Sequence, residues 1–173
     1  MRVGYLTGER IYFRPLEESD QETATAWFDS PFPINGTRAK AYFDEDQEDW
    51  YSARFFVLAL ARTDDDEVVG SVTYSSHDRR VATVGFHMAP AQNEADELRA
   101  EAIRIVIPWL RDEHEFMIVR LSIASDQPES LRAAEELGMQ TSVRLREWIA
   151  RDGTRVDEIV YEALNRRWEV QDA

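Results

Sequence analysis

The chain has 173 residues and a formal net charge of −14, and 43% of its residues are apolar. We expect one folded domain over residues 1–173, because this length and the five Trp, six Tyr and eight Phe suffice for a core. The absence of cysteine excludes disulfides and thiolate chemistry, and no apolar run approaches the ~20 residues of a membrane span. The negative charge disfavours nucleic acid and anionic membranes. The first residues lack a signal-peptide apolar region, so a cytoplasmic location is expected.

The N-terminal third predicts a strand followed by two helices. Residues 10–15 alternate apolar and polar side chains, as in a half-buried strand, and Pro15 ends it. Ser19 followed by Glu22 is a capping-box pattern and predicts a helix over residues 20–29. A loop rich in Pro, Asn and Gly follows, and then a second predicted helix over residues 37–51.

The middle of the chain predicts three antiparallel strands and a long helix. The run RFFVLALA, residues 54–61, is apolar on both faces, which indicates a strand covered on both sides. Short turns separate it from strands at residues 68–75 and 81–88, so these three form a meander. A Pro-containing turn leads into a helix that continues to Leu110, and Pro108 is expected to kink its axis.

The C-terminal third predicts a strand, a helix and a hairpin. The strand covers residues 116–124, and Asp126 is the expected cap of a helix that has Pro128 in its first turn and Gly138 after its end. The hairpin joins residues 143–150 to residues 155–164 through Asp-Gly, a strong turn signal.

Four stretches carry a family resemblance: GERIYFRPLEESD (residues 8–20), EVVGSVTY (67–74), SDQPESLRAAEELGM (125–139) and LREWIARDGTRVDEIVYEAL (145–164). In their order and spacing they resemble the RimJ/RimL-like branch of the GNAT family of N-acetyltransferases. The resemblance implies an α/β (α+β) fold with a mixed, mostly antiparallel central sheet of six to seven strands and about four helices. It also implies acetyl-CoA in a gap between the fourth and fifth strands, and an amine acceptor that is a small molecule or a protein N-terminus. Proteins of this branch are often dimers, so a homodimer is expected.

The turn before the long helix departs from the family pattern. There the family has Gln/Arg-x-x-Gly-x-Gly/Ala, because backbone N–H groups can wrap a pyrophosphate closely only where side chains are absent. This chain has Glu94, Ala95, Asp96, Glu97, Leu98 and Arg99 at those positions. Each carboxylate within about 6 Å of a pyrophosphate would cost on the order of 1 kcal/mol. Alternatively, the acids complement the dipole of their own helix. By resemblance, the cofactor contacts fall on Met88, Ala95, Arg99, Ala100, Gln127 and Ser130.

The resemblance assigns three catalytic candidates. The strand position that often holds a glutamate base is Thr83, but His87 lies on the same face and could take a proton from an ammonium group. Ser130 matches a serine that faces the thioester sulfur and can act as general acid. Glu147 matches a position that faces the acceptor. The alternatives are a packed histidine, an ordinary first-turn serine and a salt-bridged strand residue, respectively. No spacing of residues predicts a metal site.

Three functions follow from these patterns. The first is an acetyltransferase that uses acetyl-CoA and an amine, and the second is a former acetyltransferase retained as a binding or assembly module. The third keeps the pantetheine slot but uses a less anionic acyl carrier.

Overall fold

The structure of the chain is a computed structural model that describes residues 6–20, 37, 54–76, 78, 80–89, 94–151 and 153–168. Eight strands form one sheet in the order β1-β2-β3-β4-β5-β6-β8-β7. Their bounds are β1 (Leu6–Thr7), β2 (Ile11–Pro15), β3 (Arg54–Arg62), β4 (Val68–Ser76), β5 (Val81–Met88), β6 (Ile118–Ala124), β7 (Gln140–Arg151) and β8 (Thr154–Leu164). Among the described strands, only β5 and β6 pair in parallel, so the predicted mixed, mostly antiparallel sheet is confirmed. The strand count is one higher than predicted, because two-residue β1 is too short to show a period.

The predicted meander of β3, β4 and β5 is confirmed. The last part of the apolar run of β3 is covered on both faces, as expected, since Ala59, Leu60 and Ala61 are 0% exposed, whereas Phe56 near its start is 41% exposed. Strands β4 and β5 approach closely at Gly70, where an added Cβ would lie 2.2 Å from the backbone oxygen of His87. Only glycine therefore fits at this position of β4.

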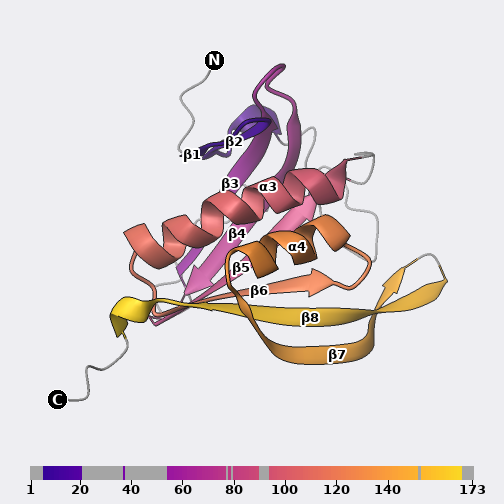
Figure 1. Ribbon diagram of the computed structural model, residues 1–173. Coiled ribbons are helices and arrows are strands. Elements are labelled where there is room, and N and C mark those ends of the chain that lie inside the picture. Colours follow the sequence, from indigo (N-terminus) through magenta and orange to yellow (C-terminus); the bar gives the residue numbers. More distant parts are fainter. Residues whose placement is uncertain are drawn as a thin grey trace.

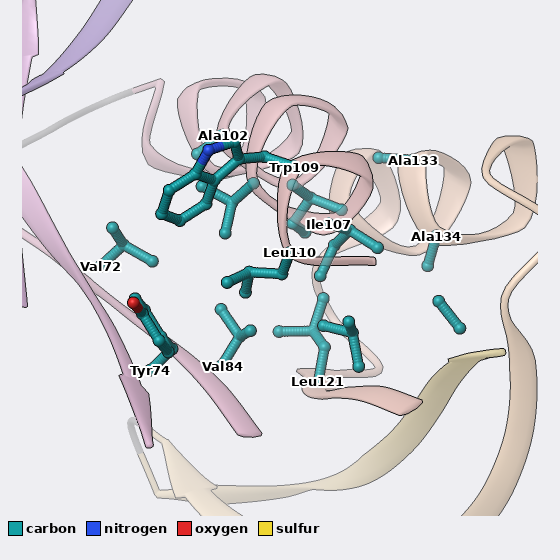
Figure 2. Close-up of a cluster of buried hydrophobic side chains, with 14 of the residues drawn as sticks. Val72, Tyr74, Val84, Ala102, Ile107, Trp109, Leu110, Leu121, Ala133 and Ala134 are labelled. Atoms are coloured by element: carbon teal, nitrogen blue, oxygen red, sulfur yellow. The ribbon is translucent and has the colours of Figure 1, made fainter. Parts of the chain in front are cut away.

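Two α-helices of the described chain, α3 (Ala95–Pro108) and α4 (Pro128–Glu136), lie side by side on one face of the sheet (Figure 1). Beneath them is the apolar core, in which Val72, Val84 and Leu121 point from the sheet toward the helices (Figure 2). Helix α3 passes at Pro108 into a π-helical turn, η2 (Trp109–Glu113). The expected disturbance at Pro108 therefore takes the form of a change in hydrogen-bond pattern.

The two predicted N-terminal helices lie outside the described residues, except for their first residues. Asp20 belongs to a 3₁₀ turn, η1 (Glu18–Asp20), and Thr37 is helical. A further 3₁₀ turn, η3 (Arg166–Trp168), follows β8. In the part of the chain that the structure describes, no helix has the length and apolarity to cross a membrane.

The predicted cap of α4 was wrong. The N-cap position is Gln127, without a side-chain cap, and Asp126 instead forms a salt bridge of 3.1 Å with Arg151 of β7. The predicted hairpin is confirmed, although β7 begins three residues earlier than expected. Its exposed polar residues hide the start of the strand from a search for alternating burial.

Candidate active site

Strands β5 and β6 pair only over their first halves. The parallel ladder joins Val81 to Ile118 and ends where Val84 meets Leu121. Beyond that point β5 still pairs with β4 as far as Met88, and β6 pairs with β8 as far as Ala124. Two strands that begin as neighbours thus separate, each held by its other partner. The last four residues of β5 are left without a β6 partner.

A carboxylate joins the beginnings of α3 and α4 beside this separation. Asp96, in the first turn of α3, accepts hydrogen bonds from the backbone N–H groups of Glu129 (2.8 Å) and Ser130 (3.2 Å). Its Oδ1 also accepts one from the Ser130 hydroxyl, at 2.6 Å. Asp96 therefore caps α4 from another helix, and holds the two N-termini together.

The other acids of the α3 turn have different surroundings. Glu94 forms a salt bridge with Arg10, whose backbone N–H also donates to Glu101 at 2.9 Å. Glu97 is exposed and makes no hydrogen bond or ion pair with another described residue. The side chain of Glu94 does not cap α3. Two of the three carboxylates are thus engaged elsewhere, and the first N–H groups of α3 have no side-chain cap.

The predicted cofactor residues lie on the elements around this point. Ala95, Arg99 and Ala100 are on the first two turns of α3, and Ala100 is buried. Gln127 closes the turn between β6 and α4, where its Oε1 accepts the Ala124 N–H at 3.2 Å. Met88 ends β5 opposite Gly70 and packs against the core.

Ser130 lies at the same junction of α3 and α4, because it is hydrogen-bonded to Asp96. It is 0% exposed, and its hydroxyl proton is directed at the Asp96 carboxylate. Ser130 is therefore a buried, hydrogen-bonded residue in the first turn of α4.

His87 lies on the opposite face of the sheet from the helices. Phe86 and Met88 pack against the core, so alternation along β5 turns His87 away from it. Directly opposite His87 on β4 is Ser71, and the next pair on this face is Gly85 with Thr73. This face of β4 and β5 is therefore polar, although Ser71 and Thr73 are buried.

Glu147 lies in a bulge of β7 rather than in a regular ladder. The register shifts between Leu145 and Ile149, and Glu147 has a positive φ of 49°. Asp157 accepts its N–H at 2.9 Å, and Arg155 donates to its carbonyl oxygen at 2.9 Å. Among the described residues its carboxylate has no ion pair, so the salt-bridged alternative does not describe it.

Asp157 also ties the bulge to the β6–α4 turn. Its N–H donates to the Ser125 hydroxyl at 3.1 Å, and its backbone oxygen accepts the Ser125 N–H at 2.9 Å. The Glu147 N–H and the Arg144 guanidinium hold the pKa of the Asp157 carboxyl below its usual value. Asp157 thus holds the backbone of Glu147 next to the β6–α4 turn, which also contains Gln127.

Residues 10–140 match the family described as the acetyltransferase (GNAT) domain. The chain belongs to the GNAT acetyltransferase family. The separation of β5 from β6 agrees with the gap between two strands that the family resemblance implies.

Solved structures agree with this assignment. A protein from Sphaerobacter thermophilus, whose acetyltransferase assignment is provisional, is 46% identical, with a TM-score of 0.77 over 96% of this chain and 99% of its own. A Bacillus anthracis GNAT acetyltransferase shares the fold at 13% identity and a TM-score of 0.66, over 92% and 98% of the two chains. Spermidine N-acetyltransferase from Vibrio cholerae, in complex with CoA and spermine, also shares the fold. Its sequence identity is 16% and its TM-score 0.64, over 90% of this chain and 96% of its own. No protein with a curated description matches.

Sequence reasoning does not find two contacts of this region. The sequence places Asp96 only at the pyrophosphate turn and near the dipole of its own helix, but its carboxylate binds backbone groups 33 and 34 residues away, at Glu129 and Ser130. No local pattern marks a cap that comes from another helix. Ser71 carries no motif, and only the register of β4 against β5 places it opposite His87.

A cleft of about 480 Å³ lies at the other end of β6 and β8. Arg111, Arg166 and Arg167 line it, together with Asn165 and the C-terminal end of α4. Arg111 is bound by Asp112 at 2.8 Å, and Arg167 by Glu115 at 3.1 Å. Arginines near helix C-termini complement the helix dipole, and none of the predicted site residues lines this cleft.

Proposed function

We propose that this GNAT protein transfers an acetyl group from acetyl-CoA to a primary amine, which is a small molecule or a protein N-terminus. The observation that carries the proposal is the separation of β5 from β6 beside the joined N-termini of α3 and α4. This arrangement leaves open backbone on β5 for an extended chain and uncapped N–H groups on α3 for a phosphate.

The acidic turn is compatible with an anionic donor in this arrangement. Glu94 is neutralised by Arg10, and Asp96 is occupied by the first N–H groups of α4. Only Glu97 remains as an unpaired carboxylate in the first turn of α3 among the described residues. Asp96 keeps its negative charge, so the cost expected from three carboxylates falls to that of two, about 1 kcal/mol each at close range. Met88, Ala95, Arg99, Ala100 and Gln127 are the proposed cofactor contacts.

His87 is the proposed base. Acetyl-CoA supplies an activated thioester, and the acceptor must lose a proton to become nucleophilic. The imidazole of His87, directly or through water, takes that proton on the face of β5 away from the helices. Glu147, held by its bulge, faces the acceptor and favours a cationic one.

Ser130 is the proposed acid for the departing thiolate. Because its proton is directed at Asp96 in this structure, the hydroxyl has to rotate toward the sulfur to donate. Replacement of both His87 and Ser130 by alanine is expected to abolish turnover, and full turnover by that variant would contradict both assignments.

The acceptor is proposed from chemistry and from resemblance. A net charge of −14 attracts cationic amines, and the fold is shared with a spermidine N-acetyltransferase. We propose polyamines and basic N-termini as the first acceptors to test, consistent with a RimJ/RimL-like protein of the cytoplasm that forms a homodimer.

Calorimetric titration with acetyl-CoA at 50 and 500 mM salt tests the proposal first. Micromolar binding that strengthens with salt is expected, because salt screens the repulsion from Glu97. Glu97→Gln should bind several-fold more tightly than wild type at low salt. The control is Glu135→Gln, which changes the net charge equally at the far end of α4.

An acceptor screen with spermidine, n-butylamine and an Ala-Arg dipeptide follows the titration. Saturable acetylation of any of them supports the proposed function. No binding at millimolar acetyl-CoA would overturn it and would leave a binding or assembly module. Binding of an acylated carrier without the nucleotide would indicate a changed donor.

A further inference from the structure

We infer that Ser71 is a positioning residue of the site. Its hydroxyl holds the water through which the ammonium proton of the acceptor reaches His87. The inference rests on the proposed function, and it adds a residue on β4 that the family resemblance does not supply.

The hydroxyl of Ser71 is buried and has no partner among the described residues. The residue is 0% exposed, and its Oγ makes no hydrogen bond with any of them. A buried hydroxyl without a partner is destabilising, so such groups are rare in folded proteins and usually have a bound water or a functional role. Ser76, on the same strand, shows the ordinary case, because its hydroxyl donates to the Asp78 carbonyl oxygen at 2.6 Å.

Ser71 lies beside His87. The two are direct partners in the antiparallel pair of β4 and β5, so their side chains share one face with Cβ atoms about 5 Å apart. At that separation one water can bridge the hydroxyl and the imidazole. The next residue of β5 on this face is Gly85, so no side chain fills the space beside His87 on its own strand.

A second unpartnered polar atom lies in the same row across the sheet. The row runs from Arg14 on β2 through Ala59 on β3 to Ser71 and His87. Arg14 binds Asp20 through both terminal nitrogens, at 2.7 and 2.8 Å, but its buried Nε makes no hydrogen bond within the described part of the chain. Ala59, a small residue, separates the two orphan atoms. Buried waters typically bind polar groups that are otherwise unsatisfied.

The proton balance is simple. The acceptor ammonium gives one proton to the water held by Ser71, the water gives one to His87, and the imidazolium later releases it to solvent. The neutral amine then forms the C–N bond as the C–S bond breaks. The nitrogen gives up its second proton in this step, and the thiolate takes up one, so the only proton released overall is the one that left through His87. Among the described residues, the charged groups of this row are Arg14 and Asp20, which neutralise each other.

The test compares Ser71→Ala with Ser76→Ala, using the acceptor of the screen that wild type acetylates fastest. Ser71→Ala should keep or raise the melting temperature, because it removes an orphan hydroxyl. It should lower kcat at pH 7 about tenfold or more and leave KM for acetyl-CoA unchanged. Ser76→Ala should lower the melting temperature and leave kcat unchanged. Ser71→Thr keeps a hydroxyl and should recover most of the rate.

The pH dependence separates a proton-transfer role from a structural one. At pH 9.5 more of the amine is already neutral, so the defect of Ser71→Ala should shrink. Wild-type kcat in Ser71→Ala at pH 7, or a defect of equal size at both pH values, would overturn the inference and leave the proposed function intact. No acetylation of any amine by the wild-type protein would overturn the proposed function, and the inference with it.

Discussion

The two faces of the sheet are stabilised in different ways. Toward α3 and α4, β4 and β5 present Val72, Tyr74 and Val84, which pack into one apolar core (Figure 2). On the opposite face the same strands present Ser71 and His87, and β2 presents Arg14. Arg14 and Asp20 are only 3% and 5% exposed. The first face depends on shape and burial, whereas the second depends on individual polar partners.

The difference shows where this fold can carry chemistry. An apolar face is satisfied by any close-packed neighbour, so it offers no polar group that could orient a substrate or move a proton. A buried polar face must satisfy each group, and a group left without a partner indicates a place for water or ligand. On the polar face that place is Ser71, beside the proposed base.

The largest expected effect is on the polar face. In the folded protein the hydrogen bonds with Asp20 raise the pKa of Arg14. Asp20→Ala removes this carboxylate and leaves the Arg14 guanidinium buried without it. The free energy of unfolding should fall by about 4 kcal/mol. Urea unfolding measures it, with Glu162→Ala as control, because Glu162 pairs with a half-exposed Arg120 and should cost less than about 1 kcal/mol. Equal losses in the two variants would contradict the comparison.

A slightly smaller loss is expected on the apolar face. Ile107 of α3 is 0% exposed in the apolar core, so Ile107→Ala removes apolar contacts and leaves a cavity. The expected cost is about 3 kcal/mol, and Ile107→Val should cost about 1 kcal/mol. A graded response of this kind marks a face held by packing. If the two variants lost the same amount, the loss would not depend on volume.

The sequence predicts the apolar face better than the polar one. The structure confirms the strands and the hairpin that local signals predict. These signals are the period of the strands, the apolar run that forms β3 and the Asp-Gly turn of the hairpin. The partners of Asp96 and Ser71 depend on register and on contacts more than ten residues apart, which no local period encodes. The family resemblance suggests Ser130 and strand alternation suggests His87 as candidates, but neither shows that Ser130 donates to Asp96 or that His87 faces a serine.

An intermediate loss is expected in the helix layer that covers the apolar face. Asp96→Ala removes the cap of α4 and leaves the buried Ser130 hydroxyl without its acceptor. Together these should cost about 2 kcal/mol. Glu97→Ala, one residue further along α3, is the matched control and should change stability by less than about 0.5 kcal/mol. Hydrogen exchange at the first N–H groups of α4 should accelerate in the first variant alone. Acceleration in both would show that the turn, and not the carboxylate, protects them.

The smallest effect is expected at β8, where the sheet extends beyond both helices. Asp157 has a pKa below the usual 3.8, because the Glu147 N–H and the Arg144 guanidinium favour its charged form. A carboxyl whose pKa is lower in the folded than in the unfolded state stabilises the protein at pH values above its unfolded-state pKa. This contribution is lost as the pH falls through its folded-state pKa. The stability difference between wild type and Asp157→Asn should therefore be largest near pH 6 and shrink below pH 4. Chemical denaturation at a series of pH values measures it. A difference that does not change with pH would mean that the bulge at Glu147 is held by shape, as the helix-facing side is, and not by the charge of Asp157.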